Sequence, residues 1–210
     1  MGDATELERL GEVMHALRRG CPWDAEQTHH SLVRYLVEES AEVVEAIEAG
    51  DDDHLCEELG DLLLQVFFHA EIAAEAGRFT IGDVASGIAA KLVARHPWVF
   101  GEESVPADVV ASWEQRKKVE KSRASALDGI PLTMDALARA GRVVSRARSH
   151  GVALDLPDEP LDADAAGAGL LALVARADAA GVDADQALRG ALRALEAAVR
   201  AAEGDAPRPD

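Results

Sequence analysis

Residues 57–72 read EELGDLLLQVFFHAEI, and this stretch decides what kind of fold the chain can form. From Leu59 to Ala70 the residues are apolar almost all round a helix of about 3.6 residues per turn. Such a helix is normally buried. Glu58 and Asp61 lie three residues apart on one of its faces, so their carboxylates must lie at the edge of a core. The stretch therefore predicts a helical core with acidic groups at its border.

The preceding stretch, LVEESAEVVEAIEAG at residues 36–50, adds more carboxylates. At about 100° per residue, Glu38, Glu42 and Glu45 fall within roughly 60° of one another, and Glu39 lies about 100° from Glu38. Valine, leucine, isoleucine and alanine fill the other side. Taken alone, this pattern favours the solvated face of an amphipathic helix, and Glu45 and Glu48 are expected to face water.

The two stretches together favour a metal site. Two helices joined by a short turn can direct Glu39 and Glu42 from one helix, and Glu58 and Asp61 from the other, to one point. Carboxylates gathered at a core edge repel one another and would become protonated unless a cation balances them. Hard oxygen ligands without histidine or thiolate favour Mg²⁺ or Mn²⁺ over zinc.

Composition limits the classes of protein to consider. The chain has 210 residues, 48% of them hydrophobic, which suits one globular domain or two small ones. Its formal charge of −18 argues against binding to a nucleic-acid polymer or an anionic membrane. Two cysteines cannot form a disulfide framework, no signal peptide is recognisable, and the longest apolar stretch is too short to span a bilayer. These features predict a cytoplasmic protein.

Helix signals follow one another along the chain, with few alternations typical of strands and 4% aromatic residues. They predict an all-α protein with a loop, CPWDAEQTHH, at residues 21–30. The expected helices run from a Thr5/Glu8 capping box to about Gly20, from a Ser31 cap to Gly50, from Asp51–Asp53 to Gly77, from a Thr80/Asp83 capping box to Arg95, from Pro106 through Trp113, over about 134–150, and over 168–203.

Several motifs resemble those of a known family. Glu38-Glu39-x-x-Glu42 followed by Glu58-x-x-Asp61 looks like the signature of the MazG nucleoside triphosphate pyrophosphohydrolases, which belong to the all-α NTP pyrophosphatase superfamily. The resemblance covers about residues 7–150 and implies a MazG-like helical bundle. Other segments are similar to MazG segments in the family's order: CPWDAEQTHHSL at 21–32, ELGDLLLQVFFHA at 58–70, KLVARHPWVF at 91–100, SWEQRKK at 112–118 and ALDGIP at 126–131.

The resemblance implies hydrolysis of a (deoxy)nucleoside triphosphate to the monophosphate and pyrophosphate, with Mg²⁺ required and Mn²⁺ as a possible substitute. By motif position, Glu39, Glu42, Glu58 and Asp61 would be the metal ligands. Glu38 would be an accessory catalytic carboxylate that could orient water or help to hold a further ion. The sequence has no P-loop, so the nucleotide must be held in another way.

Basic residues would contact the triphosphate. WEQRKKVEKSR at residues 113–123 has five bases and two acids, which is unusual in so acidic a chain. By resemblance, Trp113 stacks on the base and Lys117, one helical turn later, binds phosphate. Lys91 and Arg95 have the same spacing and would also bind phosphates. Without the family, each of these four could be an ordinary surface or core residue.

The C-terminal part suggests a second, shortened copy of the same domain. Leu62, Leu63 and Val66 recur 108 positions later as Leu170, Leu171 and Val174, whereas Glu58 and Asp61 become Ala166 and Gly169. Chance similarity between alanine- and leucine-rich helices is the other explanation. The predicted domains are therefore residues 1–125, a catalytic MazG-like domain, and residues 126–210, a connecting helix with a degenerate, non-catalytic helical region.

Two alternatives to a broad, housecleaning activity stay open. One is a relative with a narrower substrate, such as dUTP or phosphoribosyl-ATP, and the other is a non-catalytic helical interaction protein whose glutamates serve only solubility. Because MazG proteins usually assemble as dimers, a homodimer is expected.

Overall fold

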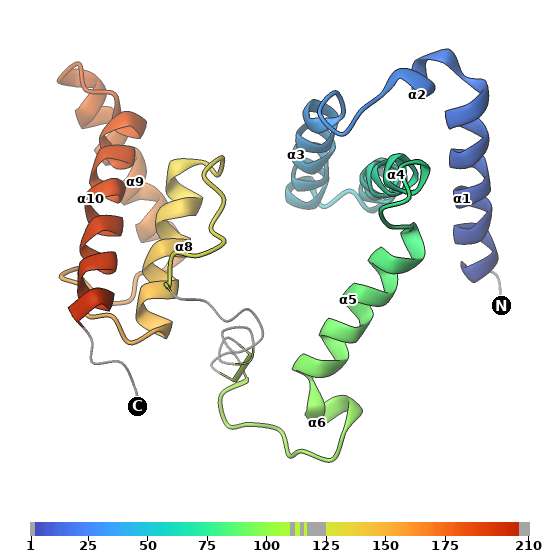
Figure 1. The fold of residues 1–210 in the computed structure, drawn as a ribbon. Coiled ribbons are helices and arrows are strands. Elements are labelled where there is room, and N and C mark those ends of the chain that lie inside the picture. Colours follow the sequence, from blue (N-terminus) through green and yellow to red (C-terminus); the bar gives the residue numbers. More distant parts are fainter. Residues whose placement is uncertain (1–2, 110–111, 114–115, 117–124, 206–210) are drawn as a thin grey trace. The chain divides into compact units, whose positions relative to one another are not determined.

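The chain forms two compact units, Met1–Glu102 and Glu103–Asp210, in a computed structural model (Figure 1). The structure describes residues 3–109, 112–113, 116 and 125–205. Within these residues all regular structure is helical and no strand occurs, which confirms the predicted all-α class. The predicted catalytic domain, residues 1–125, includes the whole first unit and the beginning of the second.

The first unit contains the four long helices that the sequence predicts, together with two short ones. Their bounds are α1 Asp3–Gly20, α2 Pro22–Glu26, α3 Val33–Ala49, α4 Asp52–Glu75, α5 Ile81–Arg95 and α6 Pro97–Phe100.

Local hydrogen bonds set the ends of the two central helices. Gly50 ends α3 with a left-handed φ of 68°, which costs glycine little because it has no Cβ. The side chain of Asp51 then caps α4 by accepting a hydrogen bond from the backbone N of His54 at 3.1 Å. The predicted Thr80/Asp83 capping box at the start of α5 is also confirmed. These signals make α3 and α4 a helical hairpin with a very short turn.

Two predicted helix starts in the first unit are wrong. Helix α1 begins at Asp3, so Thr5 lies inside the helix and does not cap it. Leu32, not Ser31, is the N-cap residue of α3, and no side chain caps that end. The Ser31 hydroxyl instead accepts a hydrogen bond from the backbone N of Thr28 at 2.9 Å. It stabilises the turn before α3 and is not available to the helix.

Two prolines begin short helices that the sequence did not predict. Pro22 starts α2 inside the expected loop at residues 21–30, and Pro97 starts α6 directly after α5. Proline suits the first turn of a helix, where its missing N–H would have no partner. A proline that ends one helix can therefore also begin a short helix directly after it.

The core of the first unit forms around α4, which contacts both α1 and α3 and lies between them in Figure 1. The expectation that α4 is buried all round is only partly correct. Leu59 is 49% exposed and Val66 is 38% exposed, because α1, α3 and α5 cover only part of the helix surface. The buried cluster consists of Met14, Leu32, Phe67 and Phe68.

A buried arginine joins the ends of α1 and α4. The Nε of Arg18 donates to Oε1 of Glu75 at 2.9 Å, and its Nη1 donates to the carbonyl oxygen of Gln27 at 3.1 Å. The hydrogen bond from Arg18 lowers the pKa of Glu75, because it stabilises the ionised carboxylate.

A histidine pair connects the turn before α3 with α4. The rings of His29 and His69 stack with centroids 5.0 Å apart, and their Nδ1 atoms are 2.7 Å apart. Arg78 donates to Nε2 of His29 at 2.6 Å, so His29 carries its proton on Nδ1 and donates to His69. Burial, followed by the neighbouring His29, lowers the pKa of His69.

The second unit packs α8, Ala136–Ser149, and α9, Ala163–Ala179, against α10, Ala184–Asp205. The helix expected over 134–150 is confirmed. The tail expected to be helical over 168–203 is two helices, and the first begins earlier because the Asp162 side chain caps it. For the helix expected from Pro106 through Trp113, residues 110–111 lie outside the described residues. Pro106 does not start it, because residues 106–108 are not helical, whereas residues 109, 112 and 113 are. The core contains Ala126, Leu127, Ile130, Val143, Ala147, Leu192 and Val199.

Among the described helices, no single one is long and apolar enough to cross a membrane. Helices α9 and α10 reach the length and apolar composition of a membrane span only when they are taken together, and the chain bends by 110° between them.

Candidate metal centre

The α3–α4 hairpin gathers three of the predicted carboxylates. One oxygen atom from each of Glu39, Glu58 and Asp61 lies within 4.8 Å of the others. Glu58 and Asp61 share a face of α4 because residues three apart in a helix are neighbours, and the packing of α3 against α4 adds Glu39. The three carboxylates come from positions up to 22 residues apart in the sequence, so tertiary packing is needed to bring them together.

The electrostatics of this cluster are unfavourable without a counter-ion. Glu58 is only 8% exposed and Glu39 is half-buried. Burial raises the pKa of Glu39, and the negative charges of Asp61, Glu42, Glu58 and Glu38 raise it further. A divalent cation would remove this repulsion, and a donor set made entirely of carboxylate oxygens fits a hard ion such as Mg²⁺ or Mn²⁺. The residues present therefore fit a metal ion.

The other predicted carboxylates lie nearby but outside the triplet. Glu42 is half-buried and Glu38 is exposed, and the charge of each acts on Glu39. The roles of Glu42 as a fourth ligand and of Glu38 as an accessory carboxylate stay predictions. Glu45 and Glu48 are exposed, as expected.

His54 belongs to this site, and the sequence reasoning missed it. Its Nε2 lies 2.8 Å from Oε1 of Glu58, where the ring N–H can donate to the carboxylate. The Asp51 cap holds the backbone of His54 in place, so the start of α4 orients the Glu58 side chain. A histidine four residues before a glutamate on one helix is a signal for such contact, because these positions face each other.

Of the four predicted substrate-binding residues, the structure describes three. Lys91 is half-buried and Arg95 is buried, both on α5 of the first unit. Trp113 is half-buried in the second unit, and Lys117 lies outside the described residues. Contacts of these four residues with a nucleotide therefore stay predictions.

Comparison with known proteins identifies the family. A model of the MazG nucleotide pyrophosphohydrolase domain matches residues 27–100, a range that includes the three clustered carboxylates. An uncharacterised 26.1 kDa protein of Streptomyces cacaoi is 50% identical over 198 residues, which are 92% of this chain and 81% of that protein. The nucleoside triphosphate pyrophosphohydrolase of Mycobacterium tuberculosis is 46% identical over 164 residues, which are 75% of this chain and 50% of that protein. The chain belongs to the MazG family.

A further MazG relative is the nucleoside triphosphate pyrophosphohydrolase of Escherichia coli, which is 44% identical over 154 residues. That match covers 70% of this chain and 59% of the relative. The chain thus spans only half to three-fifths of the length of the Mycobacterium tuberculosis and Escherichia coli relatives. The matched MazG range, residues 27–100, lies entirely within the first unit.

Proposed function

We propose that this MazG protein hydrolyses (deoxy)nucleoside triphosphates to nucleoside monophosphates and pyrophosphate, as part of nucleotide-pool housecleaning. Mg²⁺, replaceable by Mn²⁺, would be held by Glu39, Glu58 and Asp61. The observation that supports this most is the carboxylate triplet inside the family-matched range. The activity named for the relatives of Mycobacterium tuberculosis and Escherichia coli supports the choice of reaction.

The residues of the carboxylate cluster would have different roles in positioning the ion and the attacking water. A bound divalent ion would neutralise phosphate charge and make water more acidic. His54 orients the Glu58 carboxylate and holds it in place. Glu39 lies where the surrounding negative charge favours binding of a cation or a proton. Glu42 would complete the ligand set, and Glu38 would orient the attacking water.

Residues outside the carboxylate cluster would bind the rest of the substrate. Following the family resemblance, Lys91, Arg95 and Lys117 would contact the phosphates and Trp113 would stack on the base. Stacking tolerates different bases, which suits a broad substrate range. Hydrolysis requires no covalent intermediate on the protein, so positioning and charge neutralisation are enough for the reaction.

The test is hydrolysis of a panel of canonical and damaged nucleoside triphosphates by the full chain with Mg²⁺, with separate detection of monophosphate and pyrophosphate. Glu58→Gln and Asp61→Asn should abolish turnover, while the control Glu45→Gln, which removes an exposed charge from α3, should retain it. Panel members dUTP and phosphoribosyl-ATP decide between broad and narrow specificity. Absence of turnover on every member, or full activity in both cluster variants, would refute the proposal.

We also propose a homodimer. Val37, Val44 and Ile47 on α3 are 65%, 51% and 58% exposed, and Leu59 on α4 is exposed as well. A second copy could cover these apolar side chains and complete the burial of α4. Sedimentation equilibrium should show a dimer that Val37→Glu weakens, and a monomer at all concentrations would contradict it. The two free cysteines fit a reducing cytoplasm, which we propose as the location.

A further inference from the structure

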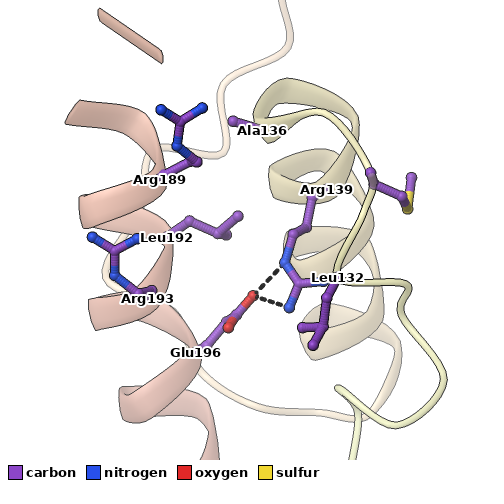
Figure 2. Close-up of a pocket in the computed structure, with 8 residues that line it drawn as sticks. Leu132, Ala136, Arg139, Arg189, Leu192, Arg193 and Glu196 are labelled. Carbon is purple, nitrogen blue, oxygen red and sulfur yellow. Dashed lines mark hydrogen bonds and ion pairs between the residues drawn. The ribbon is translucent and has the colours of Figure 1, made fainter. Parts of the chain in front are cut away.

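The second unit has a pocket of about 310 Å³ between α10 and the start of α8 (Figure 2). Its lining combines four apolar residues with three arginines and one glutamate, so its formal charge is +2 in a chain of −18. Figure 2 shows Arg189, Arg193 and Glu196 coming from α10, and Arg139 from α8. A gathering of arginines is unusual in so acidic a protein.

One of the arginines, Arg139, makes its hydrogen bonds within the protein. Arg139 donates from Nε to Oε1 of Glu196 at 2.9 Å, and its Nη2 lies 2.7 Å from the same oxygen (Figure 2). Its Nη1 donates to the carbonyl oxygen of Pro131 at 2.6 Å. Both side chains are largely buried, at 13% and 18% exposed. This ion pair joins α8 to α10. Because Arg139 neutralises Glu196, this carboxylate does not compete with a ligand for the other arginines.

The other two arginines remain available for a ligand. Arg189 pairs with Asp185 one turn earlier on α10, but both side chains are at least half exposed, and such pairs are weak. Among the described residues, Arg193 has no hydrogen-bond or ion-pair partner, and its side chain is exposed. Its Nη2 would lie 3.8 Å from a Cβ at Gly190, so the guanidinium lies beside Gly190, one turn earlier on α10.

The apolar part of the pocket limits what can bind. Leu192 is buried at 4% exposure in its inner wall, and Leu132 is 84% exposed at its rim. An apolar group could cover Leu132 while resting on Leu192, and covering exposed leucine favours binding. The volume is at the lower end of the range for small-molecule sites. The pocket therefore suits a compact ligand with one apolar and one charged end.

We propose that this pocket binds a small organic oxyanion, a carboxylate or a phosphate on a compact apolar body, through Arg193 and Arg189. Guanidinium groups pair with both anions through two parallel hydrogen bonds. The apolar body contacts Leu132 and Leu192. The pocket lies in the second unit, outside the family-matched range, contains none of the clustered carboxylates, and binds its ligand without a metal.

The experiment is a titration of the ¹⁵N-labelled full chain in EDTA, followed by amide chemical shifts. The probes are phenyl phosphate and benzoate, with inorganic phosphate and cyclohexanol as controls for the charged and apolar halves. Binding should move the amides of residues 132–139 and 189–196. Phenyl phosphate binding alone would assign a phosphate ligand, and benzoate binding alone a carboxylate; either result supports the site.

The variant Arg193→Gln should weaken binding about tenfold or more, as expected for one charge-assisted pair. The matched control is Arg200→Gln, which removes the same charge from an exposed position on α10 outside the pocket and should bind as the wild type does. Thermal melts check that both variants fold. Equal weakening in the two variants would mean a general charge effect and would overturn the proposal, as would shifts from neither probe or shifts confined to the first unit.

Discussion

Replacing Glu39 by glutamine should stabilise the metal-free protein and at the same time weaken its response to Mg²⁺. The Glu39 carboxylate lies close to those of Glu58 and Asp61, and burial together with their charges raises the pKa of Glu39. The glutamine side chain keeps nearly the same shape but removes one of the repelling charges. A site built for a cation thus costs stability when the cation is absent, whereas a solvated helix face does not.

The magnitude follows from the distances. Two unit charges 4.8 Å apart repel by about 1 kcal/mol at the dielectric constant of water and by about 3.5 kcal/mol at an effective value of ~20. Because Glu39 is half-buried, screening favours the lower end, and a gain of about 1–2 kcal/mol is expected. For a unit of about 100 residues this corresponds to a rise in Tm of roughly 4–8 °C per kcal/mol.

The assay is urea unfolding in EDTA and in excess Mg²⁺, with hydrogen exchange of the α4 amides to report on the first unit alone. Wild-type protein should gain about 2.7 kcal/mol when Mg²⁺ is at one hundred times its Kd, and Glu39→Gln should gain much less. The control is Glu45→Gln, an exposed carboxylate on the same helix. If the two variants have the same stability in EDTA and the same response to Mg²⁺, the reasoning about the charge cluster is refuted.

Three further predictions test contacts of the first unit. His54→Ala should weaken Mg²⁺ binding about 10–100-fold in calorimetry, because Glu58 loses the group that orients it; unchanged affinity would exclude this role. Glu75→Gln should cost about 1–3 kcal/mol in urea unfolding, because buried Arg18 loses a charged partner. Since the folded pKa of Glu75 is lowered, its contribution is present above the unfolded pKa and lost as pH falls through the folded pKa, so the cost should shrink in acid. The pKa of His69 is lowered in the folded protein, so between that folded pKa and about 6.5 the unfolded chain binds more protons and the free energy of unfolding should rise with pH. If His69→Gln leaves the pH dependence of the unfolding free energy unchanged, this prediction is contradicted.

Much of the fold follows from local signals. The Gly50 turn, the Asp51 cap and the Thr80/Asp83 capping box each depend on groups within a few residues of one another, so their effect can be recognised without the tertiary structure. The same kind of signal failed at Ser31, because its hydroxyl had a competing partner in the preceding turn. Sequence patterns identify groups that are able to cap a helix, but competition among neighbours decides which of them do.

By itself, the sequence determined the all-α class, the four long helices of the first unit and the carboxylate pair Glu58 and Asp61, which three-residue spacing puts on one face of α4. Only the tertiary structure decided that Glu39, and not Glu42, joins that pair within 4.8 Å. It also decided that Arg139 pairs with Glu196, 57 residues away, and leaves Arg193 available. The physical reason is that spacing along a helix is fixed by backbone hydrogen bonds, whereas contacts between helices depend on how their apolar faces pack.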